Sequence, residues 1–264
     1  MFNRPKAGTE YHKIQSVDRM LEETYRAEQR HFWFRGFRRF VRPLLQAATR
    51  GLDHPRLLDC GCGTGANLKL LGEFGTPFGV DLTWRGLRFA HDSGMQRLAR
   101  GTVASLPFCA GTIDIAVSFD VLYCLDDESE RRAIAEMWRV LKSGGALIVN
   151  VAALDILKGD HSQLVSEIRR YTRQGLAGKL RDAGFRIDRL TYTNASVFPL
   201  TAGVRFLQRL RGVNAEGGER GDFYLPPAPI NGLLSAVLGV EARVIEAGVN
   251  MPIGSSVLCL ARKT

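Results

Sequence analysis

The sequence predicts an α/β fold in which helices cover both faces of a mostly parallel β-sheet. From residue 56 onward, short apolar segments alternate with helical segments, a pattern typical of strand–helix–strand units. Residues 146–151 are apolar nearly throughout, as expected of a central strand that is buried on both faces. A glycine-rich stretch at 59–65 lies between the first strand and the first helix, where such folds turn sharply.

The predicted core elements follow one another in order along the chain. Strands are expected at residues 56–58, 77–80, 98–103, 113–119, 146–151, 185–192 and 256–261, and core helices at 64–72, 84–91, 128–141 and 172–183. The helix at 128–141 carries its apolar residues on one face, and Ser143-Gly144-Gly145 is expected to end it. Gly184 is expected to close the helix at 172–183 in the same way.

Two helical segments fall outside this alternation. Residues 13–48 show helical periodicity on both sides of an aromatic cluster. The segment at 193–254 is too long for a simple connection, and its apolar residues from 230 to 245 recur at helical spacing. We therefore divide the chain into a helical cap at 1–50, an α/β core at 51–192, a helical lid at 193–254 and the last core strand at 255–264. The cap and the lid are expected to cover the carboxyl edge of the sheet.

The composition is that of an ordinary globular protein and leaves the partner open. Hydrophobic residues make up 45% of the chain and charged residues 24%. The five cysteines lack the spacing of zinc ligands, and neither a signal peptide nor a long apolar run is evident, so we expect a cytoplasmic protein without a metal. The formal net charge of +9 fits a nucleic acid, an anionic lipid or an acidic substrate as partner, or simply a solvated basic surface.

The turn after the first strand has the chemistry of a nucleotide-type cofactor site. Gly61, Gly63 and Gly65 let the backbone approach a ligand, and the following helix presents unpaired N–H groups. Asp81 ends the second strand, where its carboxylate can accept hydrogen bonds from ribose hydroxyls. The same spacing also satisfies the fingerprint of NAD-dependent enzymes. Asp59 favours another cofactor, because its carboxylate suits an ammonium group and would repel a pyrophosphate. The alternative is that Asp59 only braces the turn.

Five motifs, in order and at the usual intervals, resemble the class I S-adenosylmethionine (SAM)-dependent methyltransferases. They are LLDCGCGTG at 57–65, GVDLT at 79–83, SLPF at 105–108, IDIAVSFDVLYCL at 113–125 and WRVLKSGGALIVNV at 138–151. The flanks resemble a bacterial subgroup, the methyltransferase type 11-like proteins, through HFWFRGFRR at 31–39, His161 with RRYT at 169–172, and MPIG at 251–254. The resemblance implies a Rossmann-like sheet of seven strands with the last strand antiparallel. It also implies SAM as the cofactor and S-adenosylhomocysteine as its product.

The resemblance implies roles for residues along the cofactor. These are the methionine end for Asp59, Gly61, Gly63 and Gly65, the ribose for Asp81, the adenine for Leu82, Thr102 and Leu106, and the transferred methyl for Phe119 and Asp120. Two positions depart from the family. Thr102 stands where an acid usually binds the adenine amino group, and Cys124 stands where many relatives have a histidine. We interpret Cys124 as a packing residue rather than as a nucleophile.

A second group of residues is expected on the acceptor side. His161 follows the fifth strand, where a neutral imidazole can take a proton from the acceptor; the alternative is an ordinary exposed loop histidine. Asp120 is the second catalytic candidate. The expected acceptor-binding residues are Trp33, Phe34, Tyr123, Arg169, Arg170 and Tyr171. The alternative is packing for the aromatic residues and a solvated position at the start of a helix for the arginines.

Together these features predict an enzyme that transfers a methyl group from SAM to an oxygen or nitrogen atom of a small-molecule, secondary-metabolite, or lipid- or glycan-linked acceptor. One alternative is a nucleic-acid or protein methyltransferase, which the absence of an Asn/Asp-Pro-Pro-Tyr/Phe motif disfavours. Another is a SAM-binding protein without transfer activity, which the intact turn and Asp81 disfavour. The basic amphipathic stretch at 204–211 fits either peripheral contact with a membrane or a lid helix. The sequence leaves the oligomeric state open.

Overall fold

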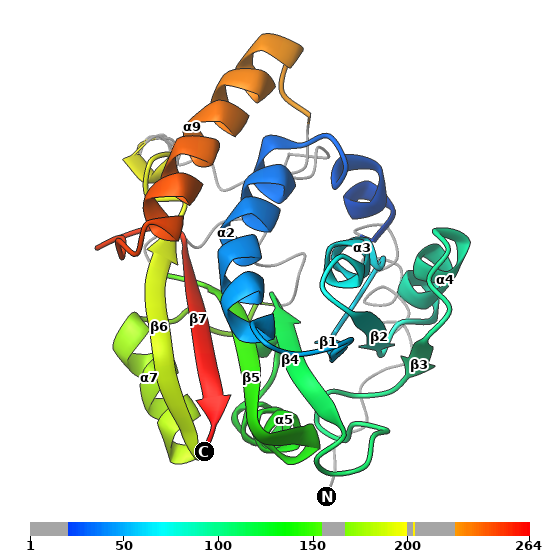
Figure 1. Cartoon of the computed structure of the whole chain (residues 1–264). Coiled ribbons are helices and arrows are strands. Elements are labelled where there is room, and N and C mark those ends of the chain that lie inside the picture. The colour runs from blue at the N-terminus through cyan, green and yellow to red at the C-terminus, as the bar shows by residue number, and fades with distance from the viewer. Residues whose placement is uncertain (1–20, 155–166, 200–202, 204–224) are drawn as a thin grey trace, which may run out of the picture.

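The computed structural model describes residues 21–154, 167–199, 203 and 225–264, and these form a seven-stranded sheet with helices on both faces (Figure 1). The strand order is β3-β2-β1-β4-β5-β7-β6. Among the described strands, β7 runs antiparallel to both of its neighbours, and the other pairs are parallel. The predicted fold class is confirmed, including the antiparallel last strand.

The elements lie close to their predicted positions. The strands are Arg56–Cys60 (β1), Thr76–Asp81 (β2), Leu98–Arg100 (β3), Ile113–Phe119 (β4), Leu141–Ala152 (β5), Phe185–Thr193 (β6) and Ser256–Lys263 (β7). The helices are Phe32–Thr49 (α2), Ala66–Gly72 (α3), Trp84–Asp92 (α4), Asp127–Val140 (α5), Arg173–Asp182 (α7) and Ala228–Glu246 (α9), with a 3-10 turn at Leu122–Cys124 (η1). The agreement is good because apolar periodicity reports burial, and burial selects these elements.

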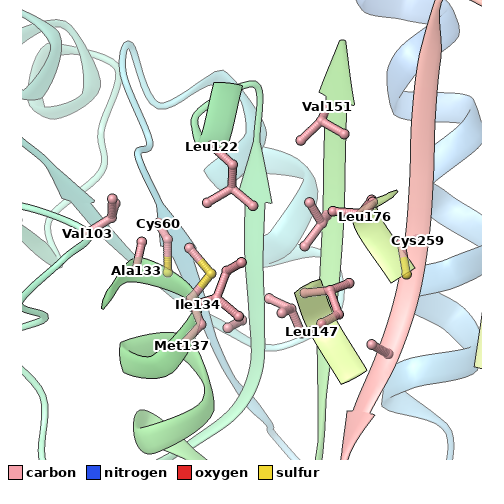
Figure 2. Packing of buried hydrophobic residues seen from close by; sticks show 14 of the residues in the cluster. Cys60, Val103, Leu122, Ala133, Ile134, Met137, Leu147, Val151, Leu176 and Cys259 are labelled. Carbon is pink, nitrogen blue, oxygen red and sulfur yellow. The ribbon is translucent and has the colours of Figure 1, made fainter. Parts of the chain in front are cut away.

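Each face of the sheet has its own apolar layer. Figure 2 shows the layer beneath α5 and α7, where Ile134, Met137 and Leu176 pack with strand residues such as Leu147. The other face is covered by α2, α3, α4 and α9, which contribute buried residues such as Phe40 to the second layer. The central strands are therefore buried on both sides, which accounts for their nearly continuous apolar sequence.

Ser143, Gly144 and Gly145 do not end α5 as predicted. The helix ends at Val140, and the chain enters β5 at once at Leu141. Gly144, with a φ of 74°, and Gly145 instead lie where the register between β4 and β5 shifts. The glycines thus mark an irregularity inside a strand, a second place where a glycine backbone is useful.

Helices α2 and α9, far apart in the sequence, lie side by side on one face of the sheet (Figure 1). The side chain of Asn231 accepts a hydrogen bond from the Phe32 N–H at 2.8 Å and donates one to the Arg30 carbonyl at 2.9 Å. The start of α9 therefore helps to fix the start of α2. By length and composition α9 could also cross a membrane, contrary to the expectation of no such segment, although core helices meet the same criterion.

The predicted cap is continuous with the core. Phe40, Leu44 and Leu45 bury the second half of α2 against the sheet, so α2 is a layer of the sandwich as well as a neighbour of its edge. The domain boundaries themselves stay a prediction. Two predicted features, His161 and the basic stretch at 204–211, lie outside the described residues.

Candidate functional site

The glycine turn joins β1 to α3 at the carboxyl edge of the sheet. Gly61, Gly63 and Gly65 have positive φ angles of 95°, 48° and 80°, which residues with side chains rarely adopt. A Cβ atom at Gly61 would lie 2.3 Å from a methyl of Val121, and one at Gly65 would lie 2.6 Å from the Cβ of Ala90. Packing therefore requires glycine at these two positions. A Cβ at Gly63 would meet nothing closer than 4.0 Å, so Gly63 leaves room for a ligand.

Asp81, at the end of β2, ties the glycine turn to the next loop. Its Oδ2 atom accepts a hydrogen bond from the Gly63 N–H at 2.8 Å. Its Oδ1 atom accepts one from the Thr83 N–H at 2.8 Å and one from the Thr83 hydroxyl at 2.5 Å. The side chain is half-buried, and Oδ2 retains capacity for a further donor. Asp81 lies where the predicted ribose contact requires it, and the contact stays a prediction.

Asp59 is a buried carboxylate without a partner. It is only 1% exposed, and neither carboxylate oxygen has a hydrogen-bond partner among the described residues. Burial, reinforced by the charge of Asp81, raises the pKa of Asp59 to about 8. An orphaned carboxylate is costly in a protein interior, and a cation at the turn would offset that cost. The ammonium group at the methionine end of SAM is such a cation, so these residues fit the cofactor that the motifs imply.

Residues 21–31 lie against the glycine turn, a contact that the sequence analysis missed. Buried Glu28 accepts a hydrogen bond from the Thr64 hydroxyl at 2.5 Å, and burial raises the pKa of Glu28. Tyr25 stacks on Phe89 of α4 with 4.6 Å between ring centroids. The N-terminal segment thus closes over the turn. This contact could not be predicted from the sequence, because no periodic pattern relates residue 28 to residue 64.

Asp120 follows β4 with a φ of 61°, and its carboxylate accepts a hydrogen bond from the Asn150 amide at 2.9 Å. The side chain keeps accessible surface, but the protein around it displaces enough water to raise its pKa to about 7. The preceding Phe119 is buried and meets Phe37 of α2 edge to face, with 5.0 Å between centroids. A carboxyl group that titrates near neutral pH can exchange a proton under ordinary conditions.

The residues predicted to contact adenine follow β2 and β3. Leu82 is 64% exposed, as an apolar contact for a planar ring should be before a ligand covers it. Thr102 is exposed, and its hydroxyl accepts a hydrogen bond from the Ala104 N–H at 3.2 Å. Leu106 is buried, and its N–H donates to Glu136 at 2.7 Å. The adenine contacts of these residues stay predictions.

Arg169 is held by internal partners. Its guanidinium donates to Asp127 at 2.6 Å, to Glu130 at 2.5 Å and to the Leu125 carbonyl at 2.8 Å. Tyr171 is buried and donates its hydroxyl hydrogen to Glu130 at 2.6 Å. These contacts attach the chain before α7 to α5. They give Arg169 and Tyr171 structural roles, and nothing in the described structure supports the predicted acceptor contacts of this pair.

Tyr123 and Arg170 lie closer to Asp120. Burial raises the pKa of Tyr123 well above its ordinary value, and the charge of Asp120 adds to the effect. Arg170 forms an ion pair with Glu167 at 2.6 Å, and the side chains of both residues are nearly buried, at 11% and 2% exposed. The structure thus gathers these four residues near the end of β4. The acceptor contacts of Tyr123 and Arg170 stay predictions.

Trp33 and Phe34 lie in the first turn of α2. The Nδ1 atom of His31 accepts a hydrogen bond from the Trp33 N–H at 3.2 Å and so caps the helix. The His31 ring also meets the ring of Phe34 edge to face. Trp33 is partly buried against the apolar layer under α2. These contacts agree with the packing alternative, and the acceptor role of both residues remains untested, as does that of His161.

Comparison with known proteins adds a family to this geometry. Residues 58–149 match the family described as a methyltransferase domain. A tRNA (carboxymethyluridine(34)-5-O)-methyltransferase of Arabidopsis thaliana is 35% identical over 102 residues, which are 38% of this chain and 24% of that protein. An uncharacterized protein of Haemophilus influenzae is 29% identical over 148 residues, which are 50% of this chain and 58% of that protein. The chain spans about half the length of the first curated relatives that it matches.

Solved structures share the fold over nearly the whole chain. A SAM-dependent methyltransferase of Thermotoga maritima gives a TM-score of 0.58 at 21% identity and covers 96% of this chain and 100% of that chain. A chain solved in complex with the Trm112 methyltransferase activator of Haloferax volcanii gives a TM-score of 0.59 at 16% identity, covering 94% and 96%. These two likenesses establish the architecture alone.

Proposed function

We propose that this chain, whose residues 58–149 match a methyltransferase domain, transfers a methyl group from SAM to an oxygen or nitrogen atom of a small-molecule or lipid- or glycan-linked acceptor in the cytoplasm. When bound, SAM supplies a methyl group already activated on a sulfonium centre. The chain's residues then have three tasks: to align the two reactants, to exclude water, and to receive a proton where the acceptor must lose one.

The observation that carries the proposal is the unpartnered carboxylate of Asp59 beneath the open face of the turn at Gly63. A turn that only connected β1 to α3 would not need a buried acid whose pKa is raised to about 8. A ligand that brings an ammonium group to Asp59 and hydroxyls to Asp81 accounts for both carboxylates at once. This argument supports SAM, and it disfavours a cofactor whose pyrophosphate would lie on the turn.

Asp120 is the described residue that we propose as proton acceptor. Its hydrogen bond from Asn150 fixes the carboxylate, and its pKa of about 7 matches the operating pH that efficient general bases require. His161 is the competing candidate. A methyl acceptor that is already deprotonated, or is a neutral amine, would need neither residue for the transfer itself.

The test is transfer of a labelled methyl group. The purified protein is incubated with methyl-labelled SAM and fractions of a metabolite extract, and the labelled product is isolated. We expect label in a small or lipid-linked molecule, with the native protein active and Asp59→Asn strongly impaired. Asp53→Asn is the matched control, because Asp53 is 98% exposed and contacts only His54 in the described structure. Equal labelling by the native protein and Asp59→Asn would contradict the proposed cofactor site.

A second candidate is methyl transfer to tRNA. It is favoured by the Arabidopsis relative, which is named a tRNA methyltransferase, and by a human relative with a similar name that is 29% identical over 156 residues. The same labelled SAM, supplied with total tRNA instead of the extract, separates the two candidates. Label that stays with tRNA through digestion to nucleosides would establish the second candidate in place of the first.

A further inference from the structure

A basic groove lies between α2 and α3, beside the glycine turn. Its volume is about 480 Å³. The charged residues that line it are Arg35, Arg38, Arg39, Arg42, Lys69 and Glu73, which is five cations and one carboxylate. A cavity of this size is typical of sites for small ligands. The excess of positive charge indicates that the ligand of this groove is an anion.

The cations form a continuous face. The four arginines stand at positions i, i+3, i+4 and i+7 of α2, which share one side of a helix. At 1.5 Å per residue, the seven steps from Arg35 to Arg42 extend about 10 Å along the axis. That length exceeds a single phosphate group. Lys69, on the exposed side of α3, adds charge from the other wall.

Three of the arginines are held by contacts with neighbouring residues, whereas Arg35 and Lys69 have no such contact among the described residues. The fixing contacts are Arg38 to the Glu28 carbonyl at 2.9 Å, Arg39 to the Ser235 carbonyl at 2.6 Å, and Arg42 to Glu73 at 2.8 Å. Each guanidinium keeps further N–H donors, because it has five. Within the part of the chain that the structure describes, the side chains of Arg35 and Lys69 have neither a hydrogen bond nor an ion pair.

This arrangement costs stability as it stands. Arg35 lies in the first turn of α2, where the helix dipole is positive and disfavours a cation. Like charges at positions i and i+4, such as Arg35 and Arg39, repel each other. Burial lowers the pKa of Arg38, and the charge of Arg35 lowers it further against the opposing effect of Glu28. An anion in the groove would offset the repulsion among these cations.

We propose that the basic groove binds a diphosphate group, or two phosphates joined by a short bridge. A guanidinium group can donate two parallel hydrogen bonds to two oxygens of one phosphate. Arg35 and Lys69, which have no hydrogen bond or ion pair among the described residues, can add contacts to those of the three fixed arginines. The groove is open to solvent but small, about 480 Å³ in volume, and it is shorter than the extended track of phosphate contacts that nucleic-acid binding requires. The chemistry is shared by nucleoside diphosphates and lipid diphosphates. The inference goes beyond methyl transfer and does not depend on it.

Calorimetry with inorganic diphosphate tests the proposal. The test variant is Arg35→Gln with Lys69→Gln, since neither side chain holds the fold together. The matched control is Arg88→Gln with Arg50→Gln, which removes two exposed cations outside the groove. We expect diphosphate to bind the native protein more tightly than monophosphate, the test variant to lose affinity by about tenfold or more, and the control to bind as the native protein does. All three proteins should bind S-adenosylhomocysteine equally.

Parallel titrations with ADP and with farnesyl diphosphate then identify which source of diphosphate the groove prefers. Native affinity for diphosphate in the test variant, or no binding of diphosphate by the native protein, would overturn the proposal. Binding of anionic vesicles or of tRNA that needs Arg35 and Lys69, without binding of any small diphosphate, would overturn it in favour of a membrane or a nucleic acid. Diphosphate binding without S-adenosylhomocysteine binding would refute the proposed function and leave the groove intact.

Discussion

Asp59 titrates in different pH ranges in the folded and the unfolded chain. The unfolded chain releases its proton near the ordinary value of 3.8, whereas burial raises the pKa in the folded chain to about 8. Between these values the folded chain holds a proton that the unfolded chain has lost, so the free energy of unfolding falls as pH rises, by at most about 1.4 kcal/mol per pH unit. We expect Asp59→Asn, measured by thermal unfolding without ligand, to gain stability relative to the native protein from pH 5 to pH 8.

The difference in unfolding free energy between the native protein and Asp59→Asn reports the titration of Asp59 alone. Asp120 and Glu28 also have raised pKa values, but they titrate in both proteins and cancel. The exposed variant Asp53→Asn should follow the native curve. Parallel curves for the native protein and Asp59→Asn would show that the carboxylate is not buried and unpaired. The same variant should bind SAM more weakly, so a gain in stability and a loss of function are expected together.

Asp120 gives a second pH signature, this time in turnover. If it receives the acceptor's proton, the ionised form is the active one, and the rate must rise with pH through a midpoint near 7. Asp120→Asn should then slow turnover by about 10²–10⁴-fold and lose that midpoint. If His161 is the base, the midpoint persists in Asp120→Asn and disappears in His161→Ala. A native pH profile in both variants would remove the need for any base.

The positions of the glycine turn and of Asp81 in the fold could be predicted because they follow strands with a clear apolar pattern, whereas their long-range contacts could not. The sequence placed Asp59 and Asp81 near the carboxyl ends of the first two strands, and they lie at the ends of β1 and β2, one residue before the last in β1 and last in β2. It could not show that Glu28 accepts a hydrogen bond from Thr64, because a single long-range contact leaves no periodic trace. It also could not show that Arg169 is held by internal acids, since an arginine that binds a ligand and one that binds the fold look alike in sequence.

At the scale of elements, the pairing of α2 with α9 depends on one small residue. A Cβ atom at Gly36 would lie 2.5 Å from Cδ1 and 3.0 Å from Cβ of Leu238, which is fully buried. Glycine inside a helix costs about 1 kcal/mol relative to alanine, but the overlap with Leu238 should cost about 1–3 kcal/mol. We therefore expect Gly36→Ala to lower the melting temperature despite its better helix propensity.

Gly178→Ala is the matched control for Gly36→Ala. Gly178 lies inside α7, and a Cβ there would have nothing within 4 Å. At this position the only expected effect is the higher helix propensity of alanine, so Gly178→Ala should raise the melting temperature slightly. A rise in both variants would mean that α9 shifts away from α2 at little cost and that the two helices are only loosely packed.

The types of the elements could be predicted because periodicity distinguishes strands from helices. The end of α5 and the role of α2 could not, because both depend on contacts with the sheet. Ser143-Gly144-Gly145 is typical of the end of a helix. In the structure Leu141 already pairs with β4 and so belongs to β5, and Gly144 lies where the register between the two strands shifts. The role of α2 as a layer of the sandwich also required the sheet. Its buried stripe, which includes Phe40 and Leu45, gives the same periodic signal for a cap as for a core helix.

At the scale of the whole molecule, the candidate site is assembled from segments far apart in the sequence. The turn after β1, the carboxylate that ends β2 and the loop after β4 meet at one edge of the sheet, and residues 21–31 close over the turn. The basic groove likewise needs α2 and α3 together. The parallel topology could be predicted and so could the shared edge. The basic groove and the contact of residues 21–31 with the turn could not be predicted, because both depend on where the N-terminal part of the chain packs.

A ligand that binds this assembled site should stabilise the whole fold, because it binds the native chain and not the unfolded one. At a concentration about 100 times its Kd, S-adenosylhomocysteine should add about 2.7 kcal/mol. For a chain of this length that corresponds to a rise of about 5–10 °C in melting temperature. NAD should give no rise, since its pyrophosphate would have to approach Asp81 and also Asp59, whose carboxylate oxygens have no hydrogen-bond partner in the described structure. The Asp53→Asn control should show the full shift and Asp59→Asn a smaller one. A shift with NAD and none with S-adenosylhomocysteine would mean that the turn binds a pyrophosphate after all, which would require Asp59 to stay protonated as its raised pKa of about 8 permits.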